Sequence, residues 1–269
     1  MTNSQPIRAY YDGTVEPIYR AISGPILHLG MFEDDEPRQV ATTRTKEYLA
    51  IHLPMPLTGL ILDLGSGYGD TARFLAQRGD CWVVGLNLIH NQNVAALTLN
   101  RQAGLEGQVR VVEADFARVP LSPGCAQVVW SQESLLHAPD RAQVLRESAR
   151  LLAPGGLLIF TDILQTGPLA PDEARLIYER VKISSLETFA SYSGYIHAAR
   201  LLIVEVADLS RYVARSYQNH IDSLHHHRAT LIDAIGAAAV DYTIGAMARW
   251  VRAAEEGKLG WGLFVARKP

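Results

Sequence analysis

Short apolar runs alternate with helix-like stretches between about residues 60 and 162. Five β-branched or aliphatic runs have the length of buried strands: 60–64, 81–86, 109–112, 127–130 and 157–161. Helical spacing follows at about 91–104 and 140–152, and Pro154-Gly155-Gly156 is predicted to form the turn from the second helix into its strand. Alternation of this kind is typical of a parallel sheet with helices on both faces.

Helical patterns continue on both sides of this region. The pattern from Pro171 to about Tyr195 predicts a cap inserted before a strand at 201–206, and a long helical stretch interrupted near Gly236 precedes a last strand at 259–265. We therefore predict one α/β, Rossmann-like domain with a seven-stranded, mostly parallel sheet. Its expected parts are a helical lid at 1–55, a core at 56–165, a cap insertion at 166–200 and a C-terminal part of the sheet with long helices at 201–269.

Composition narrows the classes of protein. The 269 residues are 48% apolar and 20% charged, enough to bury a core. A net charge of -3 disfavours nucleic acid as a partner, and no apolar run approaches the length of a membrane span or a signal peptide. Cys81 and Cys125 are interpreted as free thiols of a reducing cytosol. We expect a cytoplasmic protein with a small-molecule partner; the question of a homodimer is left open.

The most informative segment is the loop Asp63-Leu64-Gly65-Ser66-Gly67-Tyr68-Gly69, between the first strand and a helix that begins near Thr71. Glycines at this place allow a sharp turn and a close approach of ligand to backbone, at the edge where open α/β sheets bind ligands. The dinucleotide fingerprint does not fit, because the third glycine comes one residue early. A generic strand-turn-helix is the alternative.

This loop resembles motif I of the class I S-adenosylmethionine-dependent methyltransferases, Asp/Glu-x-Gly-x-Gly-x-Gly. The resemblance implies S-adenosyl-L-methionine as cofactor and S-adenosyl-L-homocysteine as product. It implies cofactor contacts for Asp63, Gly65, Gly67, Gly69, Asn87, Leu88, Gln92, Asp115, Phe116, Gln132, Tyr11 and Arg44.

Some of these positions carry specific expectations. Asn87 stands where the family usually has an acid that binds the ribose hydroxyls; an amide still offers one acceptor. Asp115 and Phe116 match the pair that meets adenine, although an aspartate at a strand end also serves as a helix cap. Arg44 is a candidate for the methionine carboxylate, with a solvated helix face as the alternative.

Almost the whole chain resembles the sarcosine/dimethylglycine N-methyltransferases. The likeness lies in Asn87-Leu88-x-x-Asn91-Gln92-Asn93, Thr161-Asp162-Ile163-Leu164-Gln165, His28-Leu29-Gly30 and Gly260-Trp261-Gly262-Leu263-Phe264. A looser likeness, through His137-Ala138-Pro139-Asp140-Arg141, links it to sugar and natural-product O-methyltransferases. N-methylation of a glycine derivative towards betaine is thus the leading hypothesis. The alternatives are O- or C-methylation of a natural product, or a fold recruited to binding or to another reaction.

Acceptor chemistry singles out a few polar side chains. Attack on a sulfonium needs a neutral amine, and His137, which titrates near neutrality, is the candidate base. Desolvation of the amine, or a purely structural His137, is the alternative. Asp162 is predicted to orient His137 or to meet the acceptor, unless it caps a helix; Glu133 is a further substrate-binding candidate, or structural.

The flanking segments supply the remaining candidates. The resemblance places Tyr10, Tyr11 and His28 in a lid over the cofactor, where Tyr10 and His28 are substrate-binding candidates; packing is the alternative for the tyrosines. A substrate carboxylate would need an arginine fork, and the sequence does not choose among Arg175, Arg180, Arg200, Arg211 and Arg215. No metal is expected, because the adjacent His225, His226 and His227 point to different faces of a helix.

Overall fold

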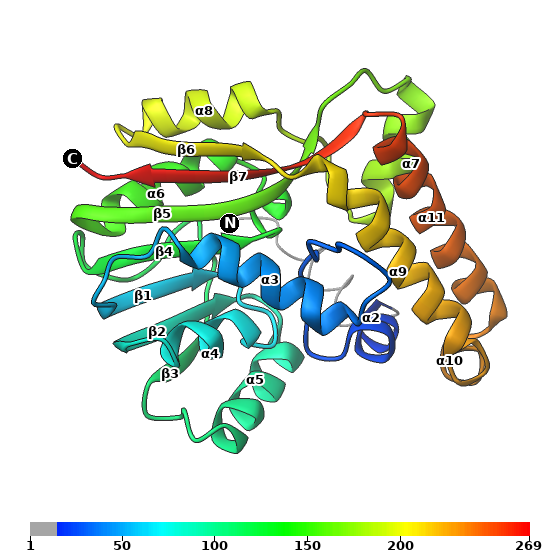
Figure 1. The fold of residues 1–269 in the computed structure, drawn as a ribbon, viewed down its shortest axis with the longest axis horizontal. Coiled ribbons are helices and arrows are strands. Elements are labelled where there is room, and N and C mark those ends of the chain that lie inside the picture. Colours follow the sequence, from blue (N-terminus) through cyan, green and yellow to red (C-terminus); the bar gives the residue numbers. More distant parts are fainter. Residues whose placement is uncertain (1–14) are drawn as a thin grey trace. The chain divides into compact units, whose positions relative to one another are not determined.

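The computed structural model describes residues 15–269, which form two compact units (Figure 1). The sheet unit comprises residues 46–162, 187–207 and 262–269. The helical unit comprises, of the described residues, 15–45, 163–186 and 208–261. Each unit is described by itself.

The sheet has seven strands in the order β3-β2-β1-β4-β5-β7-β6. The strands are β1 Thr58–Leu64, β2 Asp80–Asn87, β3 Val109–Glu113, β4 Ala126–Gln132, β5 Leu152–Gln165, β6 Leu202–Asp208 and β7 Leu259–Arg267. The pairs β1–β2, β1–β4, β2–β3 and β4–β5 are parallel. β7 runs antiparallel to β5, because Gly155 N donates to Lys268 O and Lys268 N donates to Gly156 O, each at 2.9 Å. The predicted Rossmann-like, mostly parallel sheet is confirmed.

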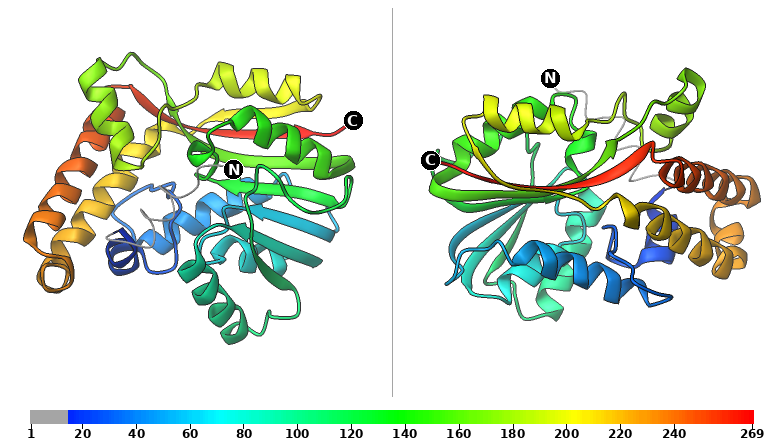
Figure 2. Two further views of the ribbon diagram at one scale, coloured as in Figure 1. Left: turned by 180° about the vertical axis from the view of Figure 1, so that it is seen from behind. Right: turned by 45° about the horizontal axis from the view of Figure 1, so that its top comes forward.

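Helices cover both faces of this sheet, as the alternating pattern predicted. α4 Asp70–Ala76 and α5 His90–Gln102 lie on one face, and α6 Arg141–Leu151 and α8 Phe189–Ala198 lie on the other (Figure 2). Central strands are therefore apolar on both sides, and Ile61, Leu62, Trp130, Ile159 and Phe160 are fully buried. Burial of such side chains is the main term that stabilises the unit.

The predicted turn at Pro154-Gly155-Gly156 is wrong. β5 already begins at Leu152, and the three residues lie inside it. The register shows why the strand is irregular there: Leu152 pairs with Ala126, whereas Leu157 pairs with Val128, so β5 carries three extra residues. Backbone hydrogen bonds to Lys268, directly after β7, are not apparent from the sequence and keep this bulge in the sheet.

The helical unit is built from helices that are far apart in sequence. They are α2 Val15–Ser23, the first part of α3 Arg38–Ala50, α7 Pro171–Arg180, the short η2 Ser210–Tyr212, α9 Val213–His226, α10 Arg228–Ile235 and α11 Ala237–Glu255. α9 packs against α2 and α11, and α7 packs against α11. The long helical stretch breaks at Gly236, as predicted, where φ is +85°, and also at His227.

Candidate active site

The glycine loop follows β1 and turns into α4 at the carboxyl edge of the sheet. Gly65, Gly67 and Gly69 have φ of 75°, 51° and 74°, in the left-handed region that favours glycine. Gly65 also has no room for a side chain, because an added Cβ would lie 2.2 Å from Ser134 Oγ. Asp63, which begins the predicted motif, is buried within β1. The loop thus presents backbone where a ligand can approach closely.

Asn87 ends β2 and lies beside this loop, since Gly65 N donates to the carbonyl of Leu86 at 2.7 Å. Its Nδ2 donates to Gln92 Oε1 and Asn93 Oδ1, each at 3.1 Å. No hydrogen bond within residues 15–269 engages Asn87 Oδ1, so the amide presents an acceptor. The amide orientation that a ribose hydroxyl needs is therefore set by the predicted residue Gln92 and by its neighbour Asn93.

Asp115 and Phe116 follow β3 and reach the same edge. A Cβ on Gly65 would lie 3.8 Å from Phe116 Cε1, which places that ring against the glycine loop. Asp115 Oδ1 accepts from Ala117 N at 2.9 Å. One carboxylate oxygen therefore does cap a turn, and the second oxygen carries no hydrogen bond from the described part of the chain.

Gln132 ends β4, and within residues 15–269 only the oxygen of its side-chain amide is hydrogen-bonded. Its Oε1 accepts from Thr71 Oγ1 at 2.9 Å and from Trp130 Nε1 at 3.1 Å. Gln132 Nε2 and Ser66 Oγ are both buried without a hydrogen-bond partner between residues 15 and 269. Buried polar atoms of this kind are costly, so two such atoms beside the loop fit a polar ligand there.

Two acceptor-side candidates lie just beyond β4. Glu133 has a positive φ of 45°, and its Oε1 accepts from Thr161 Oγ1 at 2.6 Å, which ties it to β5. His137 ends the short helix η1 Leu135–His137 and is half-buried. Its backbone N–H donates to the carbonyl of Ser134 at 3.1 Å. Ser134 also donates to the carbonyl of Gly65 at 3.3 Å and so links this segment to the glycine loop.

Asp162 lies fully buried in β5, and its hydrogen-bond partner comes from a distant helix. Tyr192 Oη, on α8, donates to Asp162 Oδ2 at 2.5 Å. Burial, together with the negative charge of Asp162, raises the pKa of the Tyr192 hydroxyl well above its usual value. The phenol therefore stays a donor, and the carboxylate is held in one orientation.

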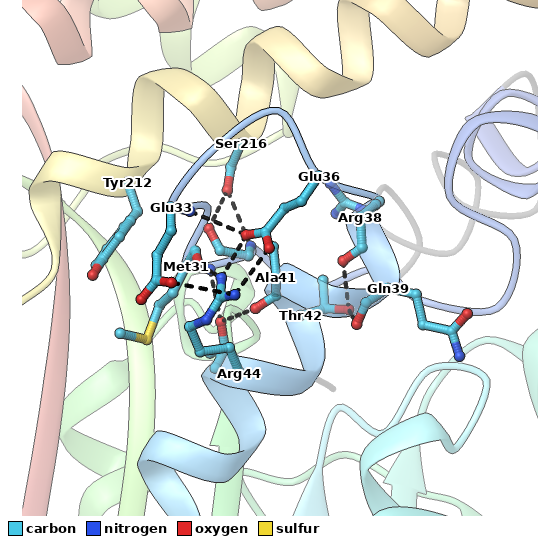
Figure 3. A network of polar contacts seen from close by, with 12 residues as sticks. Met31, Glu33, Glu36, Arg38, Gln39, Ala41, Thr42, Arg44, Tyr212 and Ser216 are labelled. Carbon is cyan, nitrogen blue, oxygen red and sulfur yellow. Dashed lines mark hydrogen bonds and ion pairs between the residues drawn. The ribbon is translucent and has the colours of Figure 1, made fainter.

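The remaining candidates belong to the helical unit or precede residue 15. Both terminal nitrogens of the Arg44 guanidinium donate to the Glu36 carboxylate, at 2.5 and 2.9 Å, and one of them also donates to Met31 O at 2.6 Å (Figure 3). Binding a cofactor carboxylate would require breaking this pair. His28 is buried, and its carbonyl accepts from Arg38 at 2.5 Å. Tyr10 and Tyr11 lie outside the described residues.

The structure thus groups most of the predicted residues at one edge of the sheet unit. Leu88 is half-buried directly after Asn87. Four residues outside the sequence predictions hold the predicted ones in place by hydrogen bonds: Thr71, Ser134, Thr161 and Tyr192. The first three lie near predicted positions, whereas Tyr192 is delivered by a helix 30 residues further along the chain from its partner.

Comparison with known proteins agrees with this arrangement. Residues 62–160 match a methyltransferase domain family. The chain is 31% identical over 265 residues to the sarcosine/dimethylglycine N-methyltransferase of Halorhodospira halochloris, covering 97% of this chain and 95% of that protein. It is 32% identical over 252 residues to the 27-O-demethylrifamycin SV methyltransferase of Amycolatopsis mediterranei (strain S699), covering 91% of each.

A solved structure shows the same fold. The crystal structure of a candidate sarcosine dimethylglycine methyltransferase from Galdieria sulphuraria has a TM-score of 0.89 at 24% identity, over 96% of this chain and 98% of that one. Three observations point to the same family. They are identities above 30% over nearly whole chains, the domain match at residues 62–160 and the geometry of the glycine loop. The chain therefore belongs to the class I S-adenosylmethionine-dependent methyltransferases.

Proposed function

We propose that this methyltransferase methylates the nitrogen of a small amino acid, sarcosine or dimethylglycine, on the route to betaine. The observation that carries this assignment is the likeness, over nearly the whole of both chains, to the Halorhodospira halochloris enzyme. This likeness also covers the helical unit, which lies outside residues 62–160 that match the methyltransferase domain.

The residues at the sheet edge are assigned to the cofactor by the groups they present. Bound S-adenosylmethionine supplies an electrophilic methyl group on its sulfonium. Asn87 Oδ1 accepts from a ribose hydroxyl, the second oxygen of Asp115 accepts from the adenine amine, and Phe116 packs on the base. Gln132 Nε2 is a buried donor for the same ligand. Asp63, Leu88, Gln92 and the three glycines complete this set.

The acceptor side needs a group that takes a proton. A secondary or tertiary amine is largely protonated near neutral pH, as lysine is, so it must lose a proton before its lone pair attacks the methyl carbon. We assign that proton to an imidazole nitrogen of His137. Asp162 and Glu133, both oriented by hydroxyl donors, are assigned to positioning. In-line alignment of the two bound reactants supplies much of the remaining rate.

A second acceptor class has its own support. The likeness to 27-O-demethylrifamycin SV methyltransferase is as strong in identity and nearly as long. Methylation of an oxygen or a carbon on a larger natural product is therefore the alternative.

A direct assay separates the two. The protein is incubated with S-adenosylmethionine and either sarcosine or dimethylglycine, and release of S-adenosylhomocysteine is followed. We expect product with at least one amine. No product with either amine, while the protein still binds S-adenosylhomocysteine, would contradict the leading assignment.

Replacing the assigned base tests the mechanism. His137→Ala should lower kcat by about 10²-fold or more, since general base catalysis contributes about 10²- to 10⁴-fold. Affinity for S-adenosylhomocysteine, measured by calorimetry, should stay within about twofold of wild type. His90→Ala, an exposed histidine of the same unit, is the control and should change neither quantity. Equal losses of kcat and cofactor affinity in His137→Ala would rule out an acceptor-side role.

The partners and cellular location of the protein are proposed from its net charge and its helices. None of the helices within residues 15–269 has both the length and the apolar character needed to cross a membrane. We propose a cytoplasmic enzyme that acts on a free small molecule without nucleic acid, consistent with a net charge of -3. A homodimer would be detected by light scattering of the purified protein.

A further inference from the structure

The two ends of the glycine loop are held by different kinds of hydrogen bond. At the start of the loop, the backbone N–H groups of Gly65 and Ser66 donate to the carbonyl of Leu86, at 2.7 and 3.2 Å. At its end, the carbonyl of Tyr68 accepts from a side chain, NH1 of Arg73 on α4, at 2.8 Å. Glycine has more backbone freedom to lose than any other residue, so a loop with three glycines depends on such fixed points.

Arg73 is itself tied to α5. The same nitrogen, NH1, also donates to Oδ1 of Asn100 at 3.1 Å. Arg73 is half-buried, and no carboxylate within residues 15–269 forms an ion pair with it. Burial lowers the pKa of its guanidinium, because a charge is less stable away from water. An arginine in such a place is costly unless the hydrogen bonds that it makes serve a purpose.

Asn100 takes part in this contact through one side-chain atom. The residue is fully buried, and its Oδ1 accepts from Arg73. Its Nδ2 is buried without a hydrogen-bond partner in the described part of the chain. A buried donor without a partner destabilises a fold. The oxygen, and not the nitrogen, is therefore the atom that makes an asparagine useful at this position.

The third glycine of the loop lets these groups come close to the backbone. A Cβ added to Gly69 would lie 3.1 Å from NH1 of Arg73 and 3.7 Å from Oδ1 of Asn100. Two turns before Asn100 on α5, Gln92 accepts from the side-chain amide of Asn87. One helix therefore contacts both the glycine loop and the residue assigned to the ribose.

We propose that Arg73 is a positioning residue for the cofactor: with Asn100 as its anchor on α5, it fixes the carbonyl of Tyr68 and so holds the glycine loop in the conformation that binds S-adenosylmethionine. A loop that is already ordered loses less conformational entropy when the ligand binds, which raises affinity. The role depends on cofactor binding alone, so it is the same for an amine acceptor and for a larger natural product.

Calorimetry with S-adenosylhomocysteine tests this role on the whole chain. Arg73→Met keeps the aliphatic stem and removes the donors. It should weaken binding by about tenfold or more, as expected when hydrogen bonds from a charged group are lost. Arg101→Gln, which changes an exposed arginine next to Asn100, is the matched control and should leave affinity within about twofold. Wild-type affinity in Arg73→Met would overturn the proposal.

Variants of Asn100 test the anchor. Asn100→Leu removes the acceptor and should weaken binding by about fivefold or more. Asn100→Asp keeps an acceptor oxygen for Arg73 and should stay within about twofold of wild type. If Asn100→Asp loses as much affinity as Asn100→Leu, the oxygen does not anchor Arg73 and the proposal is wrong. These two variants also decide the question if Arg73→Met does not fold.

Two measurements separate positioning from a general loss of stability. Val144→Ala shortens a fully buried side chain on α6, which should lower the urea midpoint and leave S-adenosylhomocysteine affinity within about twofold. With an acceptor that supports turnover, Arg73→Met should raise KM for S-adenosylmethionine about tenfold and leave kcat within about twofold. Equal affinity losses in Val144→Ala and Arg73→Met, or a loss confined to kcat in Arg73→Met, would contradict a positioning role.

Discussion

The sheet unit and the helical unit both hold polar side chains in fixed positions, but they do so in different ways. At the edge of the sheet, the groups come from loops that directly follow β1, β2, β3 and β4, and much of what they present is backbone or a short side chain. In the helical unit, Arg180, Tyr19 and His220 come from three helices, and their long side chains are held by aromatic packing. We therefore expect the edge of the sheet to be sensitive to changes of backbone geometry, and the helical unit to be sensitive to the loss of single side-chain atoms.

The largest effect should therefore come from a backbone change in the glycine loop. Gly65→Ala places a methyl group 2.2 Å from Ser134 Oγ at a residue with φ of 75°, so the loop must move. We expect cofactor affinity to fall about 100-fold or more, measured by calorimetry with S-adenosylhomocysteine.

Gly124→Ala is the matched control for this change. Gly124 has nearly the same φ, 71°, but a Cβ there meets nothing within 4 Å. It should lower stability by about 1 kcal/mol, the cost of left-handed backbone in an L-residue, and leave cofactor affinity unchanged. Similar affinity losses in both variants would mean that backbone strain, and not the approach to Ser134, controls the site.

The next effect tests whether one side-chain atom also matters in the sheet unit. Tyr192→Phe removes the hydroxyl that donates to the buried Asp162. The free energy of unfolding, from urea denaturation, should fall by about 1.5–3 kcal/mol, because a carboxylate loses a hydrogen bond where water does not replace it.

A neighbouring tyrosine provides the comparison. Tyr195 Oη lies 3.3 and 3.4 Å from the Glu187 carboxylate oxygens and is only partly buried. Tyr195→Phe should stay within about 0.5 kcal/mol of wild type. If the two variants lose equal stability, burial of Asp162 does not decide the strength of its hydrogen bond.

The smallest effect concerns the helical unit at acid pH. The hydrogen bonds from Arg44, and then the backbone N–H of Glu33, lower the pKa of Glu36 from 4.5 to about 2. Because the folded pKa is depressed, this pair stabilises the fold above about pH 4.5, and the contribution disappears as pH falls towards 2. The Tm difference between wild type and Glu36→Gln should therefore shrink over that range. Glu255→Gln, an exposed carboxylate of α11, should give no such trend.

The sheet was largely predictable because its signals are local. Buried parallel strands read as short apolar runs, and each run from residue 60 to 161 lies within a strand of the structure. The exception was Pro154-Gly155-Gly156, where backbone pairing with β7, more than 100 residues away, overrides the local preference for a turn. Glycine and proline indicate a local backbone preference, and they do not indicate which distant segment pairs with the backbone.

In the candidate site, too, some residues were predictable from the sequence and others were not. The glycine loop, Asn87 and Asp115-Phe116 lie at strand ends, so position in the chain already placed them together. Arg44 shows the limit of such reasoning, because the sequence placed it on a helix but not next to Glu36. Sequence spacing along one helix defines a face, whereas the partner of a long side chain depends on which other helix packs there.

The sequence by itself determined the strands of the sheet and the glycine loop, since these depend on residue types at short spacings, and its resemblance to a methyltransferase family implied the cofactor and the chemistry. Tertiary structure decided which of five equivalent arginines is buried, which tyrosine meets Asp162, and that the buried His220 has no hydrogen-bond partner among residues 15–269. The physical reason is that burial and hydrogen-bond partners depend on packing between segments that are 30 or more residues apart, and no local pattern encodes them.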